Sequence, residues 1–212
     1  DQQLYLDAGI CPVGQVSQID DTYANLDTRL VRGHDLGIYY SFDSGIGDFD
    51  IRYVASFLDK YEQQPGAAAS MLLDAQASGE LPADVPVTGF SDLVRMDGNA
   101  ESKHTVRVSW RKNNWGAGVS AVRLGDFIQT SLTLEDSLTL RPIYYVVPDM
   151  TTYNLTVDYR FDSFMDSNTR VRLGIRNLTD ERAPLADDSF GYFADMHQDL
   201  GINYYLDVRL SF

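Results

Sequence analysis

Apolar and polar residues alternate with a period of two in seven stretches of the chain, and the last stretch shows this most clearly. Its apolar positions are Ile202, Tyr204, Leu206, Val208, Leu210 and Phe212. The positions between them are Asn203, Tyr205, Asp207, Arg209 and Ser211. Because successive side chains of a β-strand point to opposite faces of the sheet, this stretch predicts a strand with one apolar and one charged face.

Six earlier stretches repeat the alternation. They cover residues 36–42, 49–57, 106–110, 115–124, 152–161 and 169–177. In the stretch 115–124 the apolar positions change phase near Val122 and Leu124, which predicts a β-bulge. The sequence therefore predicts an all-β fold with about seven strands between residues 25 and 212.

The predicted connections alternate between short and long. Short turns fall at 43–48, 112–114 and 162–168, and long loops fall near 62–102, 131–150 and 178–199. The alanine-rich residues 66–73 in the first long loop are compatible with a short helix. Such long loops are uncommon in compact soluble domains. They are typical of antiparallel transmembrane β-barrels, which have short periplasmic turns and long extracellular loops.

Aromatic residues of the apolar faces gather where strands meet the predicted short turns. They are Phe42, Phe49, Trp110, Trp115, Tyr159, Phe161 and Phe212. In a membrane barrel, rings at this level form a girdle at the lipid headgroups. A soluble β-sandwich also alternates apolar and polar positions, but it gives no reason for aromatic residues at one end of the strands. We therefore expect this set at the membrane interface.

The polar positions of the strands carry arginines and aspartates, which a water-filled or plugged lumen tolerates better than a packed interior does. Over the whole chain, 17 basic and 31 acidic residues give a net charge of −14. This excess of negative charge disfavours nucleic acid as a partner. It favours cationic ligands, and the acidic long loops could bind calcium. A solvated surface is the alternative interpretation of those loops.

No motif for catalysis or for a resident metal stands out. His34, His104 and His197 lack the paired spacing that would put two metal ligands on one face. No G-x-S-x-G nucleophile elbow is present. The single Cys11 excludes an internal disulfide, so we expect a buried or lone thiol, or a bridge to a residue outside this sequence. We expect a protein that is not an enzyme, with an outer-membrane hydrolase as the alternative.

Strand parity predicts an orientation. If Phe212 lies at the periplasmic end, the strand that ends at Phe42 descends from outside. Residues 1–24 would then belong to an extracellular loop, and residues 1–212 would form the C-terminal part of one barrel domain. Bacterial barrels have an even number of strands, so we expect further strands upstream. A missed strand around Leu4 is the alternative.

The last residues of the chain carry a pattern more specific than alternation. The strand Arg170–Arg176 leads into Asn177-Leu178-Thr179-Asp180, and the final strand runs from Tyr204 to Phe212. This series resembles the end of a TonB-dependent outer-membrane receptor, with Thr179 in place of the usual aromatic residue. The resemblance implies a barrel of about 22 strands, filled by a plug domain that lies outside this sequence. It also implies recognition of the terminal strand by the barrel-assembly machinery.

The resemblance further implies uptake of a scarce nutrient through the outer membrane of a Gram-negative bacterium, with energy from the TonB complex and lipid around the barrel. The nutrient would be a siderophore, a metal complex, cobalamin or an oligosaccharide. Charged lumen residues would hydrate the lumen or anchor the plug: Asp158, Arg160, Arg172 and Arg176. The candidate ligand contacts are Tyr144, Tyr145, Arg176, Tyr192 and Phe193. The alternatives are a passive porin, a structural outer-membrane barrel and a soluble carbohydrate-binding β-protein.

Overall fold

The computed structural model describes most of the chain. The described residues are 28–83, 85, 87, 90–138, 142–164 and 167–211. The predictions for residues 1–24, for Cys11 and for Phe212 lie outside them.

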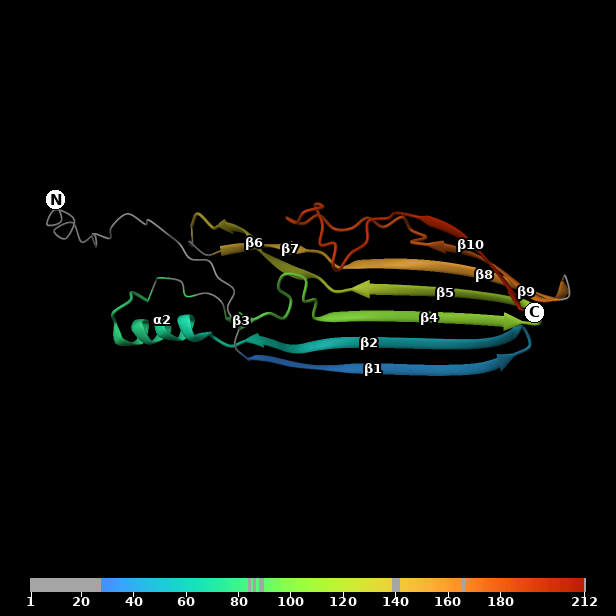
Figure 1. The fold of residues 1–212 in the computed structure, drawn as a ribbon, viewed down its shortest axis with the longest axis horizontal. Coiled ribbons are helices and arrows are strands. Elements are labelled where there is room, and N and C mark those ends of the chain that lie inside the picture. The colour runs from blue at the N-terminus through green and yellow to red at the C-terminus, as the bar shows by residue number, and fades with distance from the viewer. Residues whose placement is uncertain are drawn as a thin grey trace.

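One large antiparallel sheet dominates the fold (Figure 1). Its main path follows sequence order through β1 (Arg29–Ser44), β2 (Gly47–Gln63), β4 (Ser102–Lys112), β5 (Trp115–Leu124), β8 (Met150–Phe164), β9 (Ser167–Arg176) and β10 (Asn203–Ser211). The two-residue strand β3 (Ser91–Asp92) pairs with β2. The predicted all-β, antiparallel character is confirmed.

The register keeps like faces together across the whole sheet. Phe42 lies opposite Phe49, and Phe49 in turn lies opposite Trp110. On the other face, Asp158 lies opposite Gly116 and Arg172. A shift of one residue would move every side chain of a strand to the wrong face, so the alternation in the sequence fixes the register.

Tight turns join the strands at one end of the sheet, on the right in Figure 1. Gly47 has φ +128°, and a Cβ there would lie 2.5 Å from the carbonyl oxygen of Arg111. Asn113, in the next turn, has φ 52°, a conformation that Asn tolerates better than most residues. These two residues allow the chain to reverse its direction within a few residues.

Long connections occupy the opposite end, called here the loop end. The first contains the helix α2 (Ala67–Ser78), which begins where the alanine-rich stretch predicts and runs further. Part of the predicted loop 131–150 is instead strand, because β6 (Phe127–Glu135) and β7 (Pro142–Val147) form a separate hairpin. The hairpin base is buried, with Phe127 and Val147 fully covered. Burial of these two side chains holds the base of the hairpin against the rest of the structure.

The predicted bulge near Val122 and Leu124 is wrong. Both residues keep the regular register of β5 with β4 and with β8. They lie on the same face as Gly116 and Gly118, and they line a hollow with Met196 and His197 of the last loop. The apolar residues change phase because this loop covers the polar face at the loop end, so the strand itself needs no irregularity.

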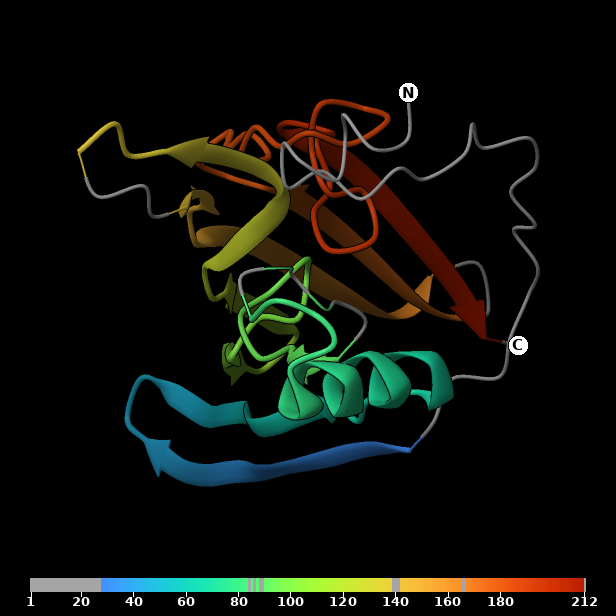
Figure 2. The ribbon, with the colours of Figure 1, turned by 90° about the vertical axis from the view of Figure 1, so that its left-hand side faces the viewer.

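The sheet is curled, as Figure 2 shows from the loop end. Side chains from β1, β2, β4, β5, β8 and β9 line one hollow on the polar face, so that face is the concave one. Within the described residues β1 pairs only with β2, and β10 only with β9, so the sheet does not close on itself. No described helix has the length and the apolar character needed to cross a membrane.

Candidate ligand-binding trough on the polar face

The two faces of the sheet differ in chemistry. The convex face is apolar, and large side chains from six of the seven strands of the main path remain exposed on it, whereas those of β2 are partly covered. The exposed side chains include Leu36, Ile38, Tyr40, Val106, Trp115, Val119, Tyr153, Val157, Leu173, Tyr204, Leu206 and Val208. The main buried core lies at the loop end and includes Leu124, Phe127, Val147 and Met150. The sheet is therefore covered on neither side by a second layer of comparable size.

The aromatic residues predicted at the turn end do meet one another there. Phe42 and Phe49 stack with ring centroids 5.0 Å apart. Trp115 and Phe161 both contact Tyr159, at 4.8 Å and 4.7 Å between centroids. Trp110 donates its indole N–H to the carbonyl oxygen of Ile46, at 2.9 Å. These contacts form a row along the turn end of the apolar face.

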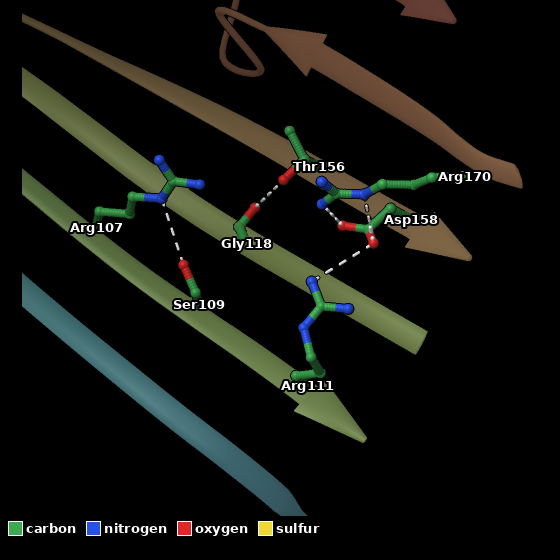
Figure 3. A network of polar contacts seen from close by, with 7 residues as sticks. All are labelled: Arg107, Ser109, Arg111, Gly118, Thr156, Asp158 and Arg170. Carbon is green, nitrogen blue, oxygen red and sulfur yellow. Dashed lines mark hydrogen bonds and ion pairs between the residues drawn. The ribbon is translucent and has the colours of Figure 1, made fainter. Parts of the chain in front are cut away.

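The concave polar face forms a trough, which contains two groups of charged residues. The first group lies toward the turns and centres on Asp158 (Figure 3). Arg170 donates to both carboxylate oxygens of Asp158, at 3.0 Å and 2.6 Å. Arg111 approaches the same carboxylate at 3.6 Å. The Asp158 side chain is only 7% exposed, so this carboxylate is held between two guanidiniums with little access to water.

A glycine makes room for this ion cluster. A Cβ at Gly116 would lie 2.9 Å from each carboxylate oxygen of Asp158, and 3.0 Å from Nη2 of Arg111. The alternation predicts that Gly116 faces the lumen, but it does not predict that two charged side chains cross over it. Arg111 and Arg170 are residues of the site that the sequence analysis missed.

The second group lies in the middle of the trough and toward the loops. Arg107, Arg172 and Arg176 line a hollow of about 250 Å³ together with the polar residues Ser120, Asn154, Thr156 and Tyr205. No Asp, Glu or Lys lines it. None of the three arginines forms an ion pair with another described residue. Arg107 contacts the hydroxyl of Ser109 at 3.3 Å, and Arg176 lies over the Tyr205 ring, 5.1 Å from its centroid.

The Tyr205 ring owes its position to a glycine on the neighbouring strand. Gly174 is the cross-strand partner of Tyr205. A Cβ on Gly174 would lie 2.2 Å from Cζ of that ring. The ring therefore lies flat over the β9 backbone and supports the Arg176 guanidinium, an arrangement that cation–π attraction favours.

The ligand contacts predicted in the loops do not form one site. Tyr144 is exposed, whereas Tyr145 donates its hydroxyl to the carbonyl oxygen of Leu185, at 3.0 Å. Phe193 packs edge-on against the buried Phe127, at 5.0 Å. Tyr192 contacts Phe190. Of the predicted set, Arg176 alone lines the trough hollow.

Contacts of Gln129, Tyr145 and His197 attach the last long loop to the hairpin, and an ion pair within the loop braces it. Gln129 is buried and exchanges two hydrogen bonds with the backbone of Asp187. Arg182 donates to both carboxylate oxygens of Asp199, at 2.7 Å and 2.5 Å. The Arg182 guanidinium and the N–H of Ala183 lower the pKa of Asp199 from 3.8 to about 2. The loop therefore lies over the hairpin and the end of the trough in a fixed arrangement.

His197 is the third point of attachment. Its ring is 3% exposed, stacks on Phe127 with centroids 6.0 Å apart, and has no hydrogen-bond partner for either nitrogen among the described residues. Burial lowers the pKa of His197, so the ring packs as a neutral aromatic group.

Metal-ligating side chains do not cluster in the part of the chain that the structure describes, where no three His, Cys, Asp or Glu residues are placed to hold one ion. Calcium binding by the acidic loops stays a prediction. Comparison of the chain with models of known families, with curated proteins and with solved structures gave no match.

Proposed function

We propose that this chain forms part of the wall of an outer-membrane β-barrel that acts as a receptor in TonB-dependent nutrient uptake. The observation that carries the proposal is the continuous, exposed apolar face opposite a charged trough. In this arrangement lipid covers the apolar face, and the trough faces the lumen.

The dimensions of the apolar face support contact with a membrane. On β8 its positions run from Tyr153 to Phe161, about 26 Å along the strand at about 3.3 Å per residue. A strand tilt of about 40° reduces this height to about 20 Å, close to the apolar band of about 25 Å in such barrels. Across the sheet, seven strands about 4.8 Å apart span about 30 Å. Soluble monomers rarely expose an apolar surface of this extent.

The ends of the sheet support an orientation. The tight turns and the aromatic row lie at one end, and the long connections lie at the other. Outer-membrane barrels have short turns on the periplasmic side and long loops outside, with aromatic girdles at the interfaces. The turn end is therefore the periplasmic side of this proposal, and the loop end is the extracellular side.

The assignment as a receptor rests on the resemblance of the last two strands to TonB-dependent receptors. In that setting, further strands close the barrel and a plug domain occupies the lumen next to the trough. The extracellular loops capture a siderophore, a metal complex, cobalamin or an oligosaccharide. The chain supplies binding and gating, and the barrel-assembly machinery inserts it into the membrane of a Gram-negative bacterium.

Two measurements test this proposal. Cell fractionation should recover the full-length protein in the outer membrane and should require detergent to release it. Recovery as a folded monomer in buffer alone would overturn the membrane assignment. Uptake of candidate nutrients should then be lost in cells that lack TonB. Uptake that persists in those cells would identify a passive porin.

A further inference from the structure

We propose that the hollow between Arg107, Arg172 and Arg176 binds an oxyanion, a carboxylate or a phosphate group. This proposal goes beyond the receptor function, because it names a ligand chemistry for the trough whether or not uptake depends on TonB. It rests on the charges, the shape and the hydrogen-bond donors of the hollow.

The charge balance of the trough is the first argument. Toward the turns, Asp158 forms ion pairs with Arg170 and Arg111, and Asp50 pairs with Arg52 at 2.7 Å. The three arginines of the hollow have no such partner among the described residues. This concentration of positive charge occurs in a chain with a net charge of −14. This charge repels a cation and attracts an anion more strongly than a neutral ligand.

Arg172 has a carboxylate on each neighbouring strand, Asp158 on β8 and Asp207 on β10. Asp158 attracts Arg172 electrostatically, but its two oxygens are hydrogen-bonded to Arg170. Asp207 forms no ion pair with Arg172 and does not line the hollow. Arg172 therefore faces the hollow without an ion pair to either carboxylate.

The shape of the hollow is the second argument. Its floor consists of small residues of β5 and β8, with Arg107 on one side and Arg172 and Arg176 on the other. A Cβ at Gly118 would lie 3.1 Å from the hydroxyl oxygen of Thr156, so even alanine would crowd the floor. Tyr205 holds Arg176 at the rim. The result is a recess of small polar groups between cationic walls.

The hydrogen-bond donors of the floor are the third argument. Asn154 accepts the backbone N–H of Asn177 with its amide oxygen, at 3.0 Å. Its amide nitrogen is therefore the end directed toward Ser120, at 3.4 Å. Because the Ser120 hydroxyl accepts this contact, its own proton is available to a ligand. Guanidiniums bind carboxylates and phosphates through paired hydrogen bonds, and a neutral donor below them completes such a site.

The oxyanion could be part of a free solute or an acidic side chain of the same protein lying in the trough. The test uses the full-length protein in a non-ionic detergent, with calorimetric titration of inorganic phosphate and of citrate. The variants are Arg107→Gln and Arg172→Gln. The control is Arg160→Gln, which removes the same charge from the same face but does not line the hollow.

If a free solute is the ligand, phosphate or citrate binds the wild-type protein, and each hollow variant weakens binding about tenfold, as expected for loss of a charge-assisted pair. The control changes it less than about twofold. If an acidic side chain of the protein fills the hollow, no added anion binds, and Arg172→Gln lowers the melting temperature whereas Arg160→Gln does not. Equal weakening by all three variants would overturn the proposal. So would the absence of both anion binding and a change in melting temperature.

This test is independent of the receptor function. Anion binding is measured in detergent solution, and membrane location and TonB dependence are measured in cells. If the protein fails to bind anions but requires TonB for uptake, only the anion-binding proposal is refuted. If the protein binds anions in the hollow but permits uptake without TonB, only the proposal of TonB-dependent uptake is refuted.

Discussion

The two faces of the same seven strands follow different physical rules. On the convex face, neighbouring side chains are apolar and exposed. Packing therefore constrains their shapes only weakly, whereas a charged side chain among them would be unfavourable. On the concave face, charges are abundant but their positions are specific, because Asp158 is fixed between two guanidiniums while three other arginines face an open hollow. A shift of one residue in the strand register would move each side chain from one face to the other.

The largest expected effect comes from moving a charge to the wrong face. Leu206→Arg places a guanidinium on the apolar face, where Leu206 is 63% exposed. If lipid covers that face, unfolding in lipid vesicles should become easier by about 2–4 kcal/mol near the bilayer midplane. The matched control is Asp207→Arg, one residue along the strand and on the polar face. Equal small effects of about 0.5 kcal/mol, as on a soluble surface, would contradict the membrane assignment.

A smaller effect is expected inside the trough. Asp158→Asn leaves Arg170 and Arg111 side by side without their shared carboxylate, and should lower the free energy of unfolding by about 2–3 kcal/mol, somewhat less than for a fully buried pair because both arginines reach solvent. Asp50→Asn on the same face, where the pair with Arg52 is exposed, should have a much smaller effect. Urea unfolding of both variants measures the difference, and equal losses would mean that Asp158 is solvated like Asp50.

Gly174→Ala tests the second group of charges, because Gly174 lies on β9 between Arg172 and Arg176. The added methyl would displace the Tyr205 ring from the backbone and from Arg176. We expect a loss of about 1 kcal/mol in stability, the scale of a cation–π contact, and weaker phosphate binding in the hollow. Tyr205→Leu should weaken binding similarly by removing the ring. Unchanged binding in both variants would show that Arg176 needs no aromatic support.

The smallest effect concerns the loop end, outside both faces. Asp199 has a pKa of about 2 in the folded protein, against 3.8 without its partners. The lowered value means that its bonds to Arg182 and Ala183 stabilise the loop above about pH 4, and that this contribution is lost as the pH falls toward 2. Pepsin cleavage within residues 178–202 should therefore rise between pH 4 and pH 2. In Arg182→Gln the cleavage should already be high at pH 4, while strand circular dichroism stays constant.

The sequence predicts the sheet well because each strand has one apolar and one polar face, and alternation records that directly. It also predicts that Asp158, Arg172 and Arg176 share the polar face. It does not predict the cluster of Arg111 and Arg170 with Asp158, because the meeting of side chains from β4, β8 and β9 depends on the offsets between strands and on their curvature. The sequence feature that could have indicated this cluster is the recurrence of arginine at polar positions of several strands.

The loop end was harder to predict for a different reason. Phe127 and Val147 are buried at the base of the β6–β7 hairpin, and Phe127 packs on the last loop, a contact between distant segments that leaves no local period. Phe193 was predicted as a ligand contact, yet its ring packs on Phe127. The phase change at Val122 and Leu124 likewise reflects a covering loop and not the strand itself. In each case the decisive neighbour lies far away in the sequence.

The strand order also bears on how such a wall could change through evolution or design. Every strand of the main path pairs with the next one in that path, and only two residues separate the strands in three of the pairs: β1 and β2, β4 and β5, and β8 and β9. Duplication or deletion of one such hairpin would widen or narrow the wall by two strands and leave the inward and outward pattern of all others intact. The hairpin is thus the module of this architecture, and the width of the sheet can vary by whole modules without redesign of any single strand.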